Sequence, residues 1–370
     1  MDKGHFAIEQ LLEQMKPLQA SDLHIKVGIP PTYRIKGSLR AVAGEPVTEE
    51  EADHMLDSLL NEQQKARFEN GGNLDFAWHL ADGDRFRINM FRSGAHPHVA
   101  VRRVQAEIPT YDELHLPQVY SDLVTKAHVG LVLVVGVTGS GKSSTLAAMI
   151  DQVNAARSVN IITIEDPVEY RFVPKKSIIS QRELGIDVSD FATALKFVVR
   201  QDPDVIFIGE MRDHDTIIAA IQAAETGHLV FATLHSADTM QAFGRILEFF
   251  PQTERGFIRS SLSNSLLAIC AQRLIPALDD FVAGVVPATE VLLNTPLVRD
   301  KIRDEEEEDL PAIIASNPNS GMHNFNQSLA RMVQDNWIDR RAALNYAPNR
   351  EALDSLLKGI DIKSSGLVGR

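Results

Sequence analysis

The chain has 370 residues, 44% of them hydrophobic and 24% charged, so it can bury a sizeable core and is long enough for two domains. Its formal net charge of −13 argues against a general nucleic-acid binder, which would carry a surplus of Lys and Arg. The one cysteine, Cys270, excludes a disulfide framework and a cysteine zinc site, so a cytoplasmic location is expected. No run of residues approaches the length of about 18 apolar positions that a membrane span needs, and any membrane association is expected to be peripheral.

The N-terminal part of the chain has the pattern of a small α/β unit. The expected elements are a helix at 6–16, strands at 21–26, 33–35 and 86–90, and a capped helix from 48 to about 60. Pro109 and Pro117 punctuate the polar stretch that follows. We therefore expect an N-terminal domain at 1–108, a linker at 109–122 and a second domain at 123–370.

In the second domain, strand and helix patterns alternate. The expected strands are 130–135, 160–164, 204–208 and 229–234, and the expected helices are 141–154, 190–200, 214–225 and 237–250. Such alternation predicts parallel strands joined by crossover helices, and hence a sheet with helices on both faces. Ligands of these sheets bind at the carboxyl ends of the strands. Beyond Pro251 the pattern is mostly helical, apart from a strand-like segment at 281–292.

A glycine-rich loop follows the first of these strands directly. Its sequence, Gly-Val-Thr-Gly-Ser-Gly-Lys-Ser at 136–143, fits G-x-x-x-x-G-K-[ST], in which backbone N–H groups and the positive end of a helix surround nucleotide phosphates. Lys142 is expected to reach the β- and γ-phosphates, and Ser143 to ligate Mg²⁺. The predicted nucleotide-binding residues are Gly136, Thr138, Gly139, Ser140, Gly141, Lys142, Ser143 and Ser144. ATP is favoured over GTP because no Asn-Lys-x-Asp element occurs.

Two acidic clusters follow other predicted strands and are expected to converge on this loop. Glu165, Asp166 and Glu169 follow the second strand; they could orient a water or a Mg²⁺-bound water, or simply cap the turn at Asp166-Pro167. Glu210 leaves the end of a fully apolar strand, as in a Walker B element, but with Gly-Glu in place of the usual Asp. Glu210 is the best candidate for the group that accepts or orients the water proton, although a solvated acid at a helix entry is the alternative. Glu169 and Glu210 are also candidate metal contacts.

Two histidines stand at the ends of the strand at 229–234. His235, at the carboxyl end, is the stronger candidate for sensing the γ-phosphate. His228 follows Gly227 at the end of a predicted helix, where a histidine is often only a partner of the helix dipole. The pair should not bind one metal, because an extended chain would hold the two side chains about 20 Å apart.

The N-terminal domain has five arginines between 85 and 103, a dense cationic cluster in an acidic protein. They could form a solvated strand face paired with neighbouring acids. An arginine that completes a phosphoryl-transfer site, however, accelerates the reaction about 10³- to 10⁵-fold, and the second domain has no obvious donor. We therefore favour arginines supplied from the N-terminal domain of a neighbouring subunit, which requires a ring.

Taken together, these motifs resemble those of the secretion-superfamily ring ATPases, and most closely the twitching-motility, or pilus-retraction, ATPases of the PilT kind. The likeness covers nearly the whole chain. The motifs that carry it are Ala20 to His24, Gly28 to Pro31, Phe86 to Arg92, the loop at 136–143, an aspartate box at 164–170, Ser180 to Glu183, Arg200 to Asp204, Gly209 to Asp213 and a histidine box at 225–236.

The resemblance implies an α/β protein with an N-terminal PAS-like domain and a RecA-like P-loop ATPase domain that ends in a helical region. It further implies a homohexamer at the cytoplasmic face of the bacterial inner membrane, acting on a PilC-like platform protein, with a paralogous retraction ATPase as a further partner. The roles it carries over are phosphate and Mg²⁺ binding for Lys142 and Ser143, the aspartate box for Glu169, the catalytic carboxylate for Glu210, the histidine box for His228 and His235, and contacts to ATP across domains for Arg87 and Arg102.

Two features bear on the branch of the family. Extension and type II secretion ATPases of this kind usually carry a four-cysteine zinc element, which a chain with one cysteine cannot build, so retraction is favoured. The basic segment linked to retraction is represented here only by 301–303, followed by six acids at 304–309. Such a run is usually solvated and self-repelling, or it could alter contact with the platform protein. The alternatives are an accessory ATPase of the PilU kind, a secretion or DNA-translocating motor, and a nucleotide sensor that does not hydrolyse ATP.

Overall fold

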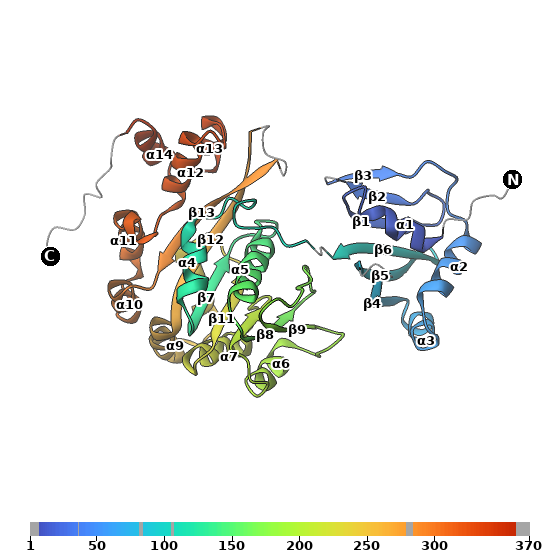
Figure 1. Ribbon diagram of the computed structural model, residues 1–370, viewed down its shortest axis with the longest axis horizontal. Coiled ribbons are helices and arrows are strands. Elements are labelled where there is room, and N and C mark those ends of the chain that lie inside the picture. Colours follow the sequence, from blue (N-terminus) through green and yellow to red (C-terminus); the bar gives the residue numbers. More distant parts are fainter. Residues whose placement is uncertain (1–6, 36, 81–83, 105–106, 279–283, 360–370) are drawn as a thin grey trace. The chain divides into compact units, whose positions relative to one another are not determined.

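The computed structural model describes residues 7–35, 37–80, 84–104, 107–278 and 284–359. The chain forms two compact units (Figure 1). Unit 1 comprises Met1–Glu107 with Glu169–Arg171, and unit 2 comprises Ile108–Val168 with Phe172–Arg370. Both are α/β units, and the expected fold class is confirmed.

Unit 1 is built on a six-stranded antiparallel sheet in the order β3-β2-β1-β6-β5-β4. Its elements are α1 (Ile8–Met15), β1 (Ala20–Lys26), β2 (Thr32–Ile35), β3 (Ser38–Ala41), α2 (Glu49–Leu59), α3 (Glu62–Gly71), β4 (Asn73–His79), β5 (Arg85–Ser93) and β6 (His96–Val104). Burial alternates along β5: Phe86, Ile88 and Met90 join the core, whereas Arg85 and Arg87 stay partly exposed. This period of two assigns the core and the arginines to opposite faces of the sheet.

Unit 2 contains a seven-stranded sheet in the order β13-β12-β7-β11-β10-β8-β9. Neighbouring strands are parallel from β12 to β9, and only β13 runs antiparallel to its neighbour. The strands are β7 (Gly130–Val135), β8 (Asn160–Glu165), β9 (Ile178–Glu183), β10 (Val205–Ile208), β11 (Leu229–Leu234), β12 (Leu266–Pro276) and β13 (Val285–Leu293). Every residue of β7, β10 and β11 is buried, as expected for parallel strands covered on both faces.

Helices surround this sheet (Figure 1). They are α4 (Gln118–Lys126), α5 (Lys142–Ala156), α6 (Phe191–Val198), α7 (His214–Glu225), α8 (Thr239–Glu248), α9 (Gln252–Ser265), α10 (Pro296–Arg303), α11 (Leu310–Ser316), α12 (Phe325–Gln334), α13 (Arg340–Tyr346) and α14 (Arg350–Leu357), with short 3-10 turns at Glu307–Asp309 and Pro318–Ser320. None of the helices within the described ranges is long and apolar enough to cross a membrane.

The structure corrects the sequence analysis in one main respect. The sequence pattern predicts helix from Pro251 up to residue 281, but Leu266–Pro276 is the strand β12, inserted beside β7. Because β12 is buried over most of its length, its apolar run has no clear period of two and cannot be distinguished by pattern from a buried helix. The expected strand at 281–292 corresponds to β13, although 281–283 lie outside the described residues. The segment expected as a linker, 109–122, includes the first turn of α4.

Candidate active site

The glycine-rich loop connects β7 to α5 at the carboxyl edge of the sheet. Gly139 and Gly141 adopt positive φ angles of 77° and 87°, which glycine reaches without strain. Gly141 is the N-cap of α5 and provides no side-chain cap, and the N-terminus of a helix is the end at which backbone N–H groups and the dipole favour an anion. Lys142 Nζ donates to the carbonyl oxygens of Gly136 (2.8 Å) and Val137 (3.0 Å), which holds the ammonium group within the curve of the loop. This arrangement suits a phosphate chain.

The expected clusters follow strands that are parallel neighbours. Across the sheet, β7 with its loop is followed by β11 with His235 after it, β10 with Glu210, and β8 with Asp166. The carboxyl ends of parallel strands lie at one edge. Glu210 is thus two strands, or about 10 Å, from the strand that leads into the loop, which leaves room between them for a terminal phosphate and a water.

The backbone on both sides of Glu210 is fixed by the neighbouring strands. Gly209 N–H donates to the carbonyl of Ile164 (2.7 Å) and Met211 N–H donates to that of Thr233 (3.0 Å). The hydroxyl of Thr233 donates to Gly209 O at 2.5 Å. Asp213 then caps α7 by accepting from Thr216 N–H at 2.8 Å. Glu210 is therefore positioned by hydrogen bonds to β8 and β11 rather than by a flexible loop.

The Glu210 carboxylate contacts two cationic or potentially cationic side chains. Oε1 lies 3.1 Å from His235 Nε2, and Oε2 lies 2.7 Å from Nε and 2.6 Å from a terminal nitrogen of Arg212. Arg212 is also 3.4 Å from Asp166 Oδ2. The pKa of Arg212 is raised by its hydrogen bond to Glu210, against an opposing effect of burial. The structure therefore brings Glu210 and His235 together and adds Arg212, which the sequence motifs do not single out.

The residues of the aspartate box occupy different environments. Glu165 is buried at the end of β8, where its Oε1 accepts from Thr163 Oγ1 (2.6 Å) and Gln181 Nε2 (3.1 Å). Asp166 is exposed and faces Arg212. Glu169 is exposed and is grouped with unit 1. Asp166 joins the Glu210 cluster through Arg212.

His228 lies at the opposite end of β11 from His235. Its Nδ1 is 2.8 Å from the carbonyl oxygen of Ala223, in the last turn of α7, and 3.3 Å from Thr226 Oγ1. This geometry matches the alternative role of a group at a helix C-terminus. The structure does not bring His228 to the Glu210 cluster.

In unit 1, Arg87 on β5 lies directly opposite Arg102 on β6. Arg102 Nε donates to Asp22 Oδ1 at 2.9 Å, while its side chain stays 69% exposed. The side chain of Arg87 makes no hydrogen bond or ion pair with any described residue. Like charges placed opposite one another in an antiparallel pair are destabilising, so this pair is a site for which an anion would be a favourable partner.

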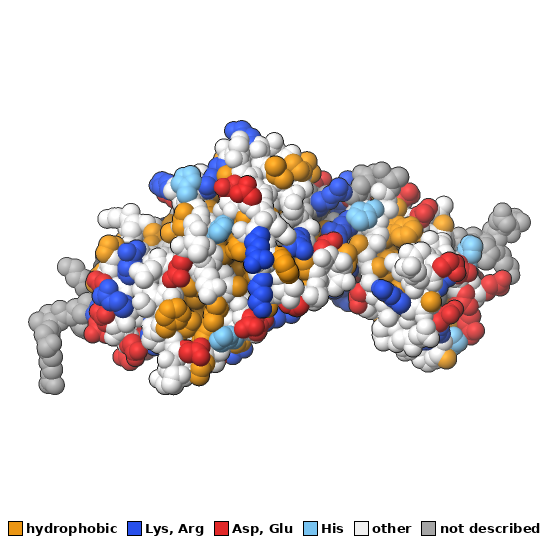
Figure 2. Space-filling model, turned by 90° about the horizontal axis from the view of Figure 1, so that it is seen from below, with side chains coloured by type: hydrophobic (Ala, Val, Ile, Leu, Met, Phe, Trp, Pro, Cys, Tyr) orange, Lys and Arg blue, Asp and Glu red, His pale blue; other side chains and the backbone are white. Residues whose placement is uncertain are grey.

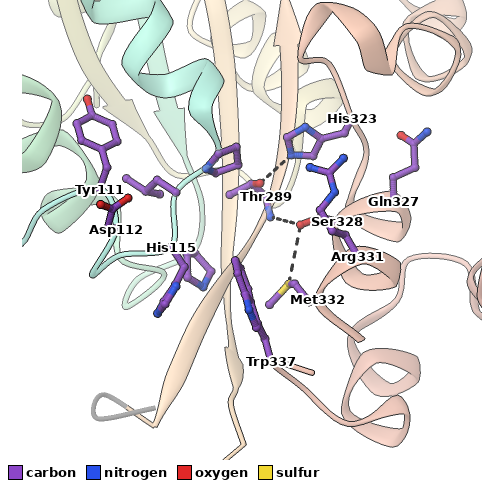
Figure 3. Close-up of a pocket in the computed structure, with 13 residues that line it drawn as sticks. Tyr111, Asp112, His115, Thr289, His323, Gln327, Ser328, Arg331, Met332 and Trp337 are labelled. Carbon is purple, nitrogen blue, oxygen red and sulfur yellow. Dashed lines mark hydrogen bonds between the residues drawn. The ribbon is translucent and has the colours of Figure 1, made fainter. Parts of the chain in front are cut away.

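A cavity of about 360 Å³ lies over β13, between the segment at 111–117 and α12 (Figure 3). Its walls include His115 and Trp337, whose ring centres are 4.9 Å apart. None of the nucleotide-binding or catalytic residues expected from the sequence lines it. Within it, Thr289 and His323 point toward one another, joined at 2.8 Å (Figure 3).

A G-x-x-x-x-G-K-S loop after β7, a carboxylate after β10 and a RecA-like sheet define the class of this protein as a P-loop ATPase. Residues 5–319 match the model of the type II/IV secretion system protein family. The chain is 39% identical over 95% of its length to the type IV pilus ATPase PilU of Pseudomonas aeruginosa, covering 91% of that protein. It is 36% identical over 92% of its length to PilT, the type IV pilus retraction ATPase of the same bacterium, covering 98% of it.

A solved structure agrees with these matches. The crystal structure of the pilus retraction motor PilT with bound ADP superposes with a TM-score of 0.85 at 38% identity, over 94% of this chain and 99% of the other. The chain belongs to the type II/IV secretion system protein family, and it is an ATPase.

Proposed function

We propose that this chain is an ATP-hydrolysing motor that works as a homohexamer and powers the retraction of type IV pili. The observation that carries the proposal is the position of Glu210, fixed at the same sheet edge as the Lys142 loop. A carboxylate there can accept or orient the proton of a water that attacks the terminal phosphate. The similarity to a retraction motor over nearly the whole chain supports the mechanical output.

In this proposal the loop residues bind the triphosphate. The N–H groups at the start of α5 and the ammonium of Lys142 bind phosphate oxygens, and His235, beside Glu210, is placed to respond to the terminal phosphate. The half-buried hydroxyl of Ser143 and the carboxylates of Glu169 and Glu210 are hard oxygen groups, the kind of ligand that suits Mg²⁺. Ser143 would hold the ion with the phosphates, and Glu169 and Glu210 would contact it through water. When bound, Mg²⁺ neutralises charge on the phosphates.

Arg87 and Arg102 provide the argument for a ring. Their like charges face each other, and a triphosphate bound to a neighbouring subunit would be a suitable anion. An arginine supplied in this way stabilises the charge that develops during phosphoryl transfer. We therefore include both as residues that complete the site of the next subunit.

The proposed partners follow from the same function. We propose that the hexamer works at the cytoplasmic face of the inner membrane on a PilC-like platform protein, with peripheral contact to the membrane and with a paralogous retraction ATPase as a further partner. Direct action on nucleic acid is disfavoured by the net charge of −13. In agreement, acidic and basic side chains are interspersed over the face shown in Figure 2.

The proposal is tested with the purified full-length chain. Lys142→Ala should abolish ATP binding or turnover, because it removes the cation of the loop. Glu210→Gln should keep ATP binding, measured with a fluorescent ATP analogue, and reduce phosphate release by about 10²-fold or more. Normal phosphate release by Glu210→Gln would reject the assigned role of Glu210.

A second candidate function is that of an accessory retraction ATPase, which depends on a partner motor. The observation in its favour is the identity to PilU, 39%, which is no lower than the identity to PilT, 36%. The two functions differ in whether this chain alone is sufficient for retraction.

A further inference from the structure

Both oxygens of the Glu210 carboxylate are engaged in this structure. One is 3.1 Å from His235 Nε2, and the other lies within 2.7 Å of two nitrogens of Arg212. A general base needs a free lone pair directed at the water proton. An oxygen that accepts two charge-assisted hydrogen bonds from a guanidinium is a weaker proton acceptor, and its approach is blocked. In this arrangement Glu210 is held in an unreactive position.

Arg212 has a second carboxylate within reach. Its third nitrogen is 3.4 Å from Asp166 Oδ2, at the end of the neighbouring strand β8. The Arg212 side chain is 56% exposed, so a change of rotamer meets little steric resistance, whereas Glu210 is only 17% exposed and its backbone is pinned. The mobile member of this cluster is therefore the arginine, and it has two acceptors.

We propose that Arg212 is a positioning residue that switches between Glu210 and Asp166. Pairing with Glu210 restrains the carboxylate, and transfer to Asp166 releases it to orient the attacking water. Asp166 thus acts through Arg212, as the acceptor that draws the guanidinium away. The fraction of subunits with Arg212 on Asp166 then sets kcat, while ATP binding at the loop is unaffected. This inference rests on the proposed ATPase function of the same site.

A double-mutant cycle in the full-length chain tests the switch, with steady-state phosphate release measured over a range of ATP concentrations. Asp166→Asn should lower kcat by about threefold or more with an unchanged KM, because Arg212 is left with Glu210 alone. Arg212→Gln should keep kcat at or above the wild-type value. In the Arg212→Gln background, Asp166→Asn should have no further effect, since the residue it acts through is gone.

Two further variants complete the design. Arg212→Lys keeps the charge but cannot donate from a planar fork. In this background the fall in kcat caused by Asp166→Asn should lie between the falls in the wild-type and Arg212→Gln backgrounds. Arg212→Lys also replaces Arg212→Gln in the cycle if the latter does not fold. Arg245→Gln, which removes an exposed arginine paired with Glu248 at 2.8 Å on α8, is the matched control and should leave both kcat and KM unchanged.

The switch is overturned if Asp166→Asn lowers kcat equally in both backgrounds, if it has no effect in the wild-type background, or if Arg212→Gln lowers kcat by about tenfold. Each of these results rejects the switch but leaves the proposed ATPase function intact. A wild-type chain that does not hydrolyse ATP, or a Glu210→Gln variant that hydrolyses it normally, rejects the function. A hydrolysing chain with an additive cycle rejects only the switch.

Discussion

At the scale of single residues, the glycine before Glu210 is as constrained as the glutamate itself. A Cβ on Gly209 would lie 3.2 Å from both Glu165 Cα and Ile164 O, and these are backbone atoms that cannot rotate away. In the phosphate loop, a Cβ on Gly136 would lie 2.2 Å from Ser140 Oγ and 2.7 Å from Gln272 O. A side chain at Gly136 therefore requires neighbouring atoms to move, and one at Gly209 makes unusually tight backbone contacts.

The pair formed by Arg87 and Arg102 gives a prediction in which stability and activity change in opposite directions. Arg87→Gln should raise the free energy of unfolding of unit 1 by about 0.2–1 kcal/mol, because it removes a like charge opposite Arg102. It should lower ATP turnover in the assembled protein. Urea unfolding followed by the fluorescence of Trp78, in a Trp337→Phe background, measures the first effect, and phosphate release measures the second.

Arg103 provides the control for this prediction. It bonds Asp84 at 2.9 and 3.2 Å, and both side chains are largely buried. Arg103→Gln should therefore destabilise unit 1 by about 3 kcal/mol, since it removes two charge-assisted hydrogen bonds from a buried carboxylate. If Arg87→Gln destabilised unit 1 in the same way, Arg87 would have a structural role and its assignment to ATP would lose its support.

The sequence predicts that Glu210 and His235 lie close together, but it does not predict that Arg212 contacts Glu210. Both predicted residues follow buried strands, so their common edge is a consequence of parallel topology. Arg212 stands two positions after Glu210, which in extended chain places both side chains on one side. That spacing makes contact feasible but does not specify it, because the contact depends on the rotamer of a long, exposed side chain.

At the scale of elements, four of the six acids at 304–309 pair with two cations of the fold. Lys301 pairs with Glu306 at 2.5 Å and with Asp309 at 2.6 Å. Arg259 on α9 pairs with Glu305 at 3.7 Å and also with Glu307. The run is therefore tied to α9 and α10 by ion pairs, while four of its six acids stay exposed to solvent, as a run of acids predicts. A charge run in a sequence does not specify the positions of its cationic partners.

The cavity over β13 is lined by a histidine that burial keeps neutral. His323 Nε2 is 2.8 Å from the Thr289 hydroxyl, and its Nδ1 is 3.1 Å from Gly321 O (Figure 3). These partners assign a neutral ring that donates from Nδ1 and accepts at Nε2. Burial lowers the pKa of His323 to about 4, with a smaller contribution from the charge on Arg331.

This lowered pKa predicts how the stability of unit 2 depends on pH. The unfolded chain takes up the His323 proton near pH 6.5, and the folded chain only near pH 4. Stability should therefore be unaffected by this group above pH 6.5 and should fall as the pH drops from about 6.5 to about 4, by roughly 3 kcal/mol in all. Urea unfolding of the wild type and His323→Gln at pH 7.5, 6 and 5, followed by Trp337 in a Trp78→Phe background, measures it.

The wild-type advantage over His323→Gln should shrink as the pH falls. His214 supplies a control of opposite sign, because its hydrogen bond to Asp215 raises its pKa. The stability that His214 contributes is present below pH 6.5 and is lost as the pH rises through the pKa of the folded state. The difference in free energy of unfolding between the wild type and His214→Gln should therefore grow toward low pH. Parallel pH curves for the wild type and His323→Gln would contradict the assignment of a buried neutral ring.

At the scale of the whole molecule, the two units differ in what their sequence pattern reveals. Unit 2 is recognisable from strands that lead into phosphate and acid motifs, and four of its predicted strands match β7, β8, β10 and β11 closely. Its edge strand β9 is not predicted, because Ile178–Glu183 is partly exposed and mostly polar. In unit 1, β3, β4 and β6 are not predicted, although each of them pairs fully with a neighbouring strand. Sheet edges and long antiparallel pairings depend on distant partners, which local periodicity does not contain.

At the scale of the assembly, pilus shortening in living cells distinguishes a motor from an accessory ATPase. In a strain that lacks every retraction ATPase, pili should extend but not shorten. Expression of this chain alone should restore shortening if it is a motor, because ATP turnover and coupling then reside in one hexamer. The Lys142→Ala chain, produced at the same level, is the matched control and should not restore it. Video microscopy of labelled pili measures the rate of shortening. If shortening returns only when a paralogous ATPase is also expressed, the accessory function is correct, and the Lys142 loop and Glu210 then serve a mixed retraction complex.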